Sequence, residues 1–174
     1  NTVEMTVDGM TTAMISGQID AAASWSPNTV TLQNALGDNY VDLGTNADFL
    51  DSAIFPSSYI CTPEYAEANH DILVRFAQAL DKAHDWRAAH PEEMAKLLAK
   101  ELDAPEDTML AAVGEADWQT ITEVCGDMDA IKTVYETQQG IFLDNGTITE
   151  NVPVEDYVLF DVMQEAYDAY RAAK

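Results

Sequence analysis

The sequence predicts an α/β fold, with a short βαβ part at the N-terminus followed by a mainly helical C-terminal part. Up to about residue 62, short apolar or alternating segments are separated by stretches with helix start and stop signals, which is typical of strand–helix–strand units. Beyond that point, apolar residues recur at helical spacing almost to the end of the chain. The 174 residues are 47% hydrophobic and 22% charged, so the chain can bury a core.

Four segments of the N-terminal part have the character of strands. Residues 2–7 alternate apolar and polar side chains, which is the period of a half-buried strand. Residues 19–23 are short and apolar, as in a buried parallel strand, and residues 40–43 form the next expected strand. Residues 53–61 are rich in aromatic and β-branched side chains, although Pro56 predicts an irregularity there. We therefore expect three strands separated by two helices, and then a fourth strand.

The two helices between these strands are marked by residues that favour helix ends. Side chains that can cap a helix precede each stretch, and glycines that tolerate left-handed backbone follow it. The expected helices are residues 10–16, capped by Asp8 and ended by Gly17, and residues 27–36, preceded by Ser26, begun by Pro27 and ended by Gly37.

The C-terminal part is expected to consist of helices, several of which begin at a proline. In the helix that begins at Pro91, the side chains Met94, Leu97, Leu98 and Leu102 form one apolar stripe, which we expect to face the core. The segment 118–124 is ambiguous. The expected helices are residues 62–67, 71–89, 91 through 102, 105 to about 113, 129–143 and about 154 to 172.

The charge of the chain excludes two classes of partner. Acidic residues number 31 against 8 Lys and Arg, which gives a net charge of −23. Phosphate binding needs clustered Lys and Arg, so nucleic acid is not an expected partner. Anionic membrane surfaces are disfavoured for the same reason. An acid excess of this size keeps a protein hydrated and self-repelling, and says little about its fold.

No motif in the sequence indicates catalysis or a metal site. The three histidines are 14 and 6 residues apart, so no two of them share a helix face, and no glycine-rich phosphate loop occurs. Cys61 and Cys125 could form a disulfide in an exported protein, or both could remain buried thiols. We therefore expect neither enzymatic activity nor a cofactor.

The sequence also bears on targeting. No stretch approaches the roughly 18 apolar residues of a membrane span, and no signal peptide opens the chain. Because the first residue is an asparagine and the next residues already have strand character, we expect a mature product or a fragment.

One segment suggests a ligand site. The expected strand at residues 19–23 ends in Ser24-Trp25-Ser26-Pro27, at the start of a helix. In open α/β sheets, ligands lie outside the carboxyl ends of strands, so Ser24 and Trp25 are directed at such a crevice. Hydroxyls, a helix N-terminus and an indole face together suit a small polar or anionic organic ligand. The alternative is that Trp25 merely covers the helix that it precedes.

Several segments resemble, in order and spacing, the periplasmic substrate-binding proteins of the nitrate/sulfonate/taurine ABC-transporter group. The first is Gly17-Gln18-Ile19-Asp20-Ala21 with Trp25 and Pro27, which is similar to that family's G-x-I-D-A…W-x-P segment. The NMT1-like thiamin-precursor proteins are related to this group. The further matching segments are Tyr59-Ile60-Cys61-Thr62-Pro63-Glu64-Tyr65-Ala66-Glu67-Ala68-Asn69, Ala88-Ala89-His90-Pro91-Glu92-Glu93, Phe142-Leu143-Asp144-Asn145-Gly146 and Val152-Pro153-Val154-Glu155-Asp156-Tyr157.

The resemblance implies a portion of a type II two-lobed periplasmic-binding-protein fold. Residues 1–48 would be the end of lobe two (βαβαβ), and residues 53–174 would be the returning strand and outer helices of lobe one. Family members are roughly twice this length, so the first half of both lobes would lie elsewhere. The N-terminal half of the same protein, or self-association of this chain, is therefore an expected partner.

The resemblance also implies ligand-binding residues. Trp25 matches the tryptophan of the family segment, and Ser57 falls where the taurine-binding relatives place an acidic contact on the returning strand. A serine there removes the partner for a ligand ammonium, so taurine is less expected than a sulfonate, nitrate-like or heterocyclic solute. We expect Ser24, Trp25 and Ser57 to line one crevice, with Asp8 and Gly9 near its rim.

The function implied is that of the solute-binding component of an ABC importer, which binds a small organic anion without chemistry and presents it to a permease. Its location would be periplasmic or extracellular, and it could be a membrane-anchored lipoprotein. Two alternatives belong to other classes. One is an enzyme similar to the thiamin-pyrimidine-precursor synthases, against which the isolated Cys61 and Cys125 count. The other is the ligand-sensing domain of a receptor.

Overall fold

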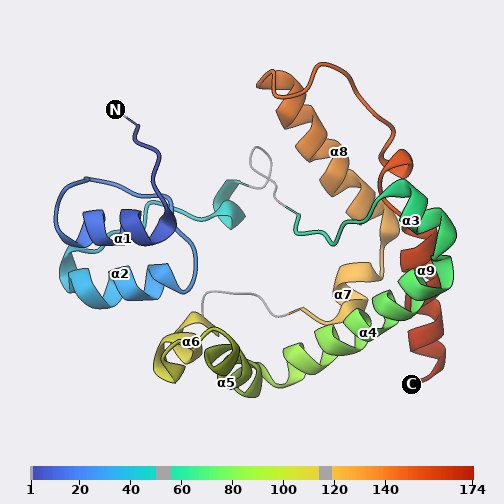
Figure 1. The fold of residues 1–174 in the computed structure, drawn as a ribbon, viewed down its shortest axis with the longest axis horizontal. Coiled ribbons are helices and arrows are strands. Elements are labelled where there is room, and N and C mark those ends of the chain that lie inside the picture. The colour runs from blue at the N-terminus through green and yellow to red at the C-terminus, as the bar shows by residue number, and fades with distance from the viewer. Residues whose placement is uncertain (1, 50–55, 114–118) are drawn as a thin grey trace. The chain divides into compact units, whose positions relative to one another are not determined.

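The computed structural model describes residues 2–49, 56–113 and 119–174 (Figure 1). Over these ranges the chain forms nine α-helices and no β-strand. The chain divides into two compact units, one of residues 1–43 with 90–118 and the other of residues 44–89 with 119–174. Among the helices described, none is long and apolar enough to cross a membrane.

The first unit holds two helix pairs. The helices are α1 (Val7–Ile15), α2 (Asn28–Leu36), α5 (Pro91–Glu101) and α6 (Glu106–Ala112), with a 3-10 turn η1 (Gly37–Asn39) after α2. Helix α1 packs on α2, α5 packs on α6, and α2 also contacts α6 (Figure 1). In the α5–α6 pair the buried side chains are Ala95, Ala99 and Met109.

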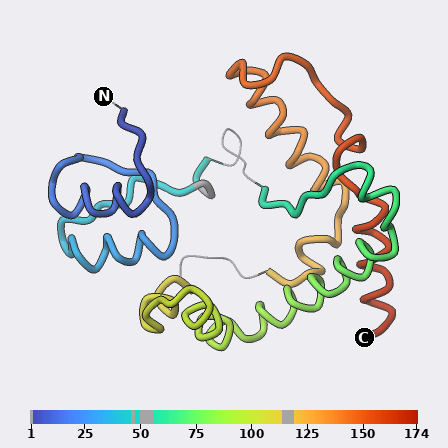
Figure 2. Tube along the Cα trace, in the orientation of Figure 1, coloured from blue at the N-terminus to red at the C-terminus, as the bar shows by residue number. Residues whose placement is uncertain are grey.

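The second unit is built around the long helix α4. Its elements are η2 (Asn46–Phe49), α3 (Pro63–Ala68), α4 (His70–Ala89), α7 (Ile121–Cys125), α8 (Met128–Asp144), η4 (Val154–Asp156) and α9 (Phe160–Ala172). Helices α4 and α9 lie side by side, as the trace in Figure 2 shows. Val74, Val162 and Ala166 are buried between them. A second cluster, of Ile121, Cys125 and Tyr167, joins α7 to α9.

The expected α/β fold class is wrong, because none of the described parts of the four expected strands is extended in a sheet. Residues 19–23 and 40–43 have no regular structure, and the same holds for residues 56–61, whereas residues 53–55 lie outside the described residues. A strand is stable only when neighbouring strands take up its backbone N–H and C=O groups. The side chains that were expected to be buried on a sheet are exposed instead, Leu43 by 82% and Ile60 by 93%.

The last residue of the first expected strand, Val7, lies in a helix, and residues 2–6 have no regular structure. Thr6 has extended backbone and its hydroxyl accepts a hydrogen bond from the Gly9 amide at 3.2 Å, so that α1 begins at Val7. Thr6, and not Asp8, is therefore the N-cap. The predicted end of this helix is correct: Gly17 has φ +70°, and the amides that follow the helix bond back in the six-to-one pattern, with Gln18 N donating to Ala13 O at 2.8 Å.

Most of the other helix boundaries lie within one or two residues of the predicted ones. The predicted start of the last helix is wrong, because Val154–Asp156 form a separate 3-10 turn and α9 begins only at Phe160. Two further details differ. In α2 the N-cap is Pro27 itself, and no side chain caps the helix, so Ser26 is not its cap. In α5 the expected apolar stripe is wrong, because α6 packs on the small side chains Ala95 and Ala99. The three leucines of the stripe, Leu97, Leu98 and Leu102, are exposed.

The described secondary structure leaves the lobes untested. Assignment of residues 1–48 and 53–174 to two lobes stays a prediction. The helices α3, α4, α5 and α8, in contrast, begin and end within about a residue of the predicted bounds. At α3, for example, the Thr62 hydroxyl caps the helix by accepting from the Tyr65 amide at 3.3 Å.

Two glycines of α8 and its C-terminal turn provide a matched test of backbone conformation. Gly146 follows the helix with φ +71° and its amide donates to Leu143 O at 3.0 Å, whereas Gly140 lies inside the helix with open space where a Cβ atom would lie. We expect Gly146→Ala to destabilise the protein by about 1 kcal/mol, because alanine is strained at positive φ. We expect Gly140→Ala to stabilise it by roughly 0.5–1 kcal/mol. Urea unfolding measures both, and equal effects would contradict the described end of α8.

Candidate functional site

The candidate site lies on the α1–α2 helix pair of the first unit. It includes Asp8 and Gly9 in the first turn of α1, and Ser24 and Trp25 just before α2. The Trp25 carbonyl accepts a hydrogen bond from the Asn28 amide at 3.0 Å, which turns the chain into α2. The position of Ser24 and Trp25 is thus fixed by the start of α2, whereas the strand expected at residues 19–23 is not formed.

The Trp25 indole is presented to solvent. The side chain is 63% exposed, so packing against the protein accounts for the smaller part of its surface. An exposed indole offers an apolar face and one N–H donor, which is why tryptophan is common where proteins bind ligands. Trp25 therefore has the surface that an aromatic ligand contact requires.

The hydroxyl of Ser24, the residue before Trp25, is buried, whereas the indole is exposed. The Oγ atom of Ser24 is buried and has no hydrogen-bond partner in the structure. A buried hydroxyl without a partner costs about 1–3 kcal/mol relative to a paired one. A ligand oxygen would recover part of that cost only where binding displaces the atoms that cover Ser24 Oγ.

The first turn of α2 contributes partial positive charge to the candidate site. The helix has nine residues and no acidic residue in its first turn, and its N-cap, Pro27, has no side chain that can accept a hydrogen bond. Its N-terminal N–H groups carry the positive end of the helix dipole, which favours an anion. The hydroxyls of Ser26 and Thr29 lie 3.3 Å apart at the same end of the helix.

A hydrogen bond between partly buried groups holds the two helices together. The Thr11 hydroxyl lies 2.9 Å from Val7 O within α1 and 3.2 Å from Asn28 Oδ1 at the start of α2, and it can donate to either oxygen. Thr11 is buried, so the contact is shielded from water. Thr11 and Asn28 were not among the predicted site residues. The signal that could have found Thr11 is its spacing of one helical turn from Val7, which places a polar side chain on the apolar face of α1.

The fifth predicted site residue belongs to the other unit. Ser57 is exposed in the segment before α3, next to Ser58, whose hydroxyl lies 2.5 Å from the hydroxyl of Tyr135 on α8. Gly9 contributes no open amide, because its N–H is bound to Thr6. The structure thus brings Asp8, Gly9, Ser24 and Trp25 into one helix pair, and a single crevice that includes Ser57 stays a prediction.

The described side chains form neither a cluster that could hold a metal ion nor a disulfide. No group of three His, Cys, Asp or Glu side chains that could hold a metal occurs within the described residues. Cys61 and Cys125 are both free thiols, the first exposed and the second buried. Burial, and then the charge of Asp81, raise the pKa of Cys125 to about 11, so this thiol stays neutral at physiological pH.

Comparison with known proteins places the α1–α2 pair in a family segment. The family model described as NMT1/THI5 like matches residues 1–94. Proteins named "Putative binding protein" from Brucella abortus strain 2308, Brucella suis biovar 1 and Brucella melitensis biotype 1 are each 32% identical to the chain over 98 residues. The aligned segment covers 56% of this chain and 30% of each relative. No solved structure matches the chain.

The Thr11 contact can be tested with a neighbouring threonine as control. Thr12 makes the same bond within the helix, to Asp8 O at 3.0 Å, but this bond is exposed to solvent. We expect Thr11→Val to destabilise the protein by about 1–2 kcal/mol, because it leaves the Asn28 oxygen without its donor. We expect Thr12→Val to change the free energy of unfolding by no more than about 0.5 kcal/mol. Equal effects of the two substitutions in urea unfolding would show that the α1–α2 bond contributes nothing.

Proposed function

Because the chain belongs to the NMT1/THI5-like family, we propose that it is the solute-binding component of an ABC importer, which binds a small organic anion without chemical change. The relatives from Brucella are named as binding proteins, which supports a binding role. In this proposal the protein delivers its ligand to an ABC permease from a periplasmic or extracellular position.

The observation that carries the proposal is the arrangement around Trp25. The exposed indole, the buried Ser24 hydroxyl and the start of α2 lie next to one another in sequence and inside the family match. An indole face binds apolar carbon, whereas a hydroxyl and a helix N-terminus bind oxygen atoms that carry negative charge. A solute with an apolar part and an anionic group, such as a sulfonate or an anionic heterocycle, matches both.

The absence of cations from this segment limits the ligand further. No lysine or arginine occurs before Arg75, so the donors near Trp25 in the sequence are neutral groups. Ser57, in place of an acidic residue, would give a ligand ammonium no partner. Both features favour a singly charged anion without an amino group over taurine itself.

The remaining partners are proposals of the same kind. The matched segment spans 30% of the relatives' length, so a complete binding protein of this family contains more chain than the segment matched here. In our proposal the additional surface is supplied by an N-terminal half of the same protein or by a second copy of this chain.

The contribution of Trp25 can be measured directly. Sulfonates, nitrate, taurine and pyrimidines are titrated against the protein by isothermal calorimetry. For the solute that binds, we expect Trp25→Ala to weaken affinity by at least about fivefold, which corresponds to about 1 kcal/mol or more for an aromatic anchor. Leu97→Ala is the control, since Leu97 is a similarly exposed large side chain in the same unit.

Two results would contradict the proposal. One is an unchanged affinity in a folded Trp25→Ala protein, which would leave the indole without a role in binding. The other is turnover of the bound compound, detected by chromatography of the ligand after incubation, which would favour the synthase-like alternative.

Ser24 allows binding and stability to be separated. Because its Oγ is buried without a partner, we expect Ser24→Ala to leave the free protein as stable as before or more stable by up to about 1 kcal/mol. The same substitution should weaken ligand binding, since the ligand loses a hydrogen bond. Thermal unfolding with and without the ligand measures both effects. Loss of stability in the free protein would show that the hydroxyl has an internal partner and no binding role.

A further inference from the structure

A carboxyl group that plays no part in the proposed site is buried in the second unit. Asp81 lies on α4, the helix that both α7 and α9 contact. Its side chain is only 6% exposed, and its Oδ2 atom has no hydrogen-bond partner. An ionised carboxylate in such a place has one oxygen atom that reaches neither water nor a donor, which makes the charged form unfavourable.

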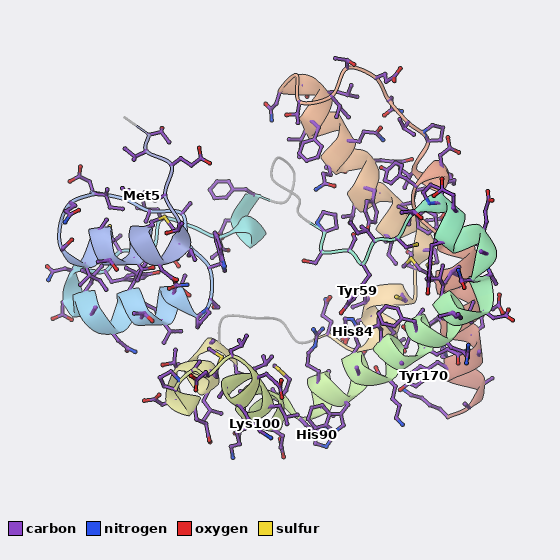
Figure 3. The ribbon with its side chains drawn as sticks, viewed as in Figure 1. Met5, Tyr59, His84, His90, Lys100 and Tyr170 are labelled. Atoms are coloured by element: carbon purple, nitrogen blue, oxygen red, sulfur yellow. The ribbon has the colours of Figure 1, made fainter. Side chains whose placement is uncertain are left out.

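The next carboxylate along the same helix face is fully satisfied. Asp85 Oδ1 accepts the Ile121 amide at 2.8 Å, at the start of α7. Asp85 Oδ2 accepts the Tyr170 hydroxyl at 2.9 Å and the Lys174 ammonium. Figure 3 marks Tyr170 on α9 and His84, the residue before Asp85 on α4. Burial opposes the ionisation of Asp85, but these hydrogen bonds outweigh it and lower its pKa.

The other groups around Asp81 do not neutralise it. On α4, His84 accepts from the Arg87 guanidinium at 2.8 Å, and burial followed by the Arg87 charge lowers its pKa. On α7, the titratable group that faces Asp81 is the neutral thiol of Cys125. On α9, the Arg171 guanidinium donates to the Tyr167 hydroxyl at 3.3 Å, and the Lys174 ammonium is bound to Asp85.

We propose that the protonation of Asp81 controls how tightly the helices pack at this three-helix junction. The packing of α4, α7 and α9 closes around the neutral carboxylic acid and loosens when the acid ionises next to the permanent charge of Asp85. Helix α7 is the element that opens, because it is five residues long and its first amide, that of Ile121, ties it to α4 through Asp85.

The direction of the pH dependence follows from the two states of Asp81. Burial, and secondly the charge of Asp85, raise the pKa of Asp81 to about 6 in the folded protein, against about 3.9 in an unfolded chain. Between about pH 4 and pH 6 the folded state holds a proton that the unfolded state has released. Stability contributed by this proton is therefore present at low pH, falls as pH rises through this window, and is absent above it.

A second titrating contact joins the same helices and has to be separated from Asp81. His70 on α4 lies 2.9 Å from Glu165 on α9, and this hydrogen bond raises the pKa of the imidazole. Its contribution also falls with rising pH, at higher values than that of Asp81. Because His70 is present in every variant compared below, its effect cancels from the differences.

The test compares Asp81→Asn with the parent chain by urea unfolding at pH 5 and pH 7.5, both above the sequence pI of about 4.1. Asparagine has the shape of the neutral acid and cannot ionise. We expect the variant to unfold less readily, with an unfolding constant about tenfold lower than that of the parent at pH 5 and on the order of a hundredfold lower at pH 7.5. Glu67 is an exposed carboxylate on α3 and serves as the control. The ratio of the unfolding constants of the parent and Glu67→Gln should be small and the same at both pH values.

A second measurement locates the opening. At pH 7.5 the amides of α7 should exchange with solvent at least tenfold faster in the parent than in Asp81→Asn, whereas the amides in the middle of α8 should differ less. Asp81→Ala is used if the asparagine variant does not fold. If Asp81→Asn lowers the unfolding constant by the same factor at pH 5 and at pH 7.5, the proposal is overturned. Failure of both variants to fold would also overturn it, because the carboxylate itself would then be required.

Discussion

The packing of α9 on α4 is the contact on which the second unit depends. Ala166 has no exposed surface, and its methyl group allows the two helices to approach closely where Val74 and Val162 pack. This approach brings the end of α9 to Asp85 on α4, whose other oxygen holds the Ile121 amide at the start of α7. A larger side chain at position 166 would separate the helices and with them the polar junction that fixes α7.

Helix ends could be predicted from the sequence because each depends on a few neighbouring residues. Thr62 caps α3, and Gly17 and Gly146 end their helices by left-handed backbone, as the local pattern indicates. Strands could not be predicted in the same way. An alternating or apolar segment such as residues 40–43 indicates which side chains a sheet would bury, but pairing depends on whether another segment supplies the ladder. In the described ranges none does, and Val41 and Leu43 remain exposed.

The candidate site was predictable to the extent that it lies at a helix start. Trp25 could be found because it precedes an obvious helix, although the strand expected before it is not formed. The link between Thr11 and Asn28 could not, since a contact between two helices depends on how they pack. Asp81 was missed for a related reason. Its burial depends on the helices that pack on α4, among them α7, whose sequence was ambiguous, and an acidic residue on a helix is ordinarily exposed.

An anion-binding role must be reconciled with a net charge of −23. Long-range repulsion is screened within about 8–10 Å at physiological salt, so it weakens encounter more than it weakens the bound state. At contact, the proposed site offers the start of α2 and the Ser24 hydroxyl, which are neutral donors and contribute less than a paired cation. Affinity then has to come largely from apolar contact with Trp25. That requirement favours anions that carry an organic group over small inorganic ions, because only the former present a surface for the indole to cover.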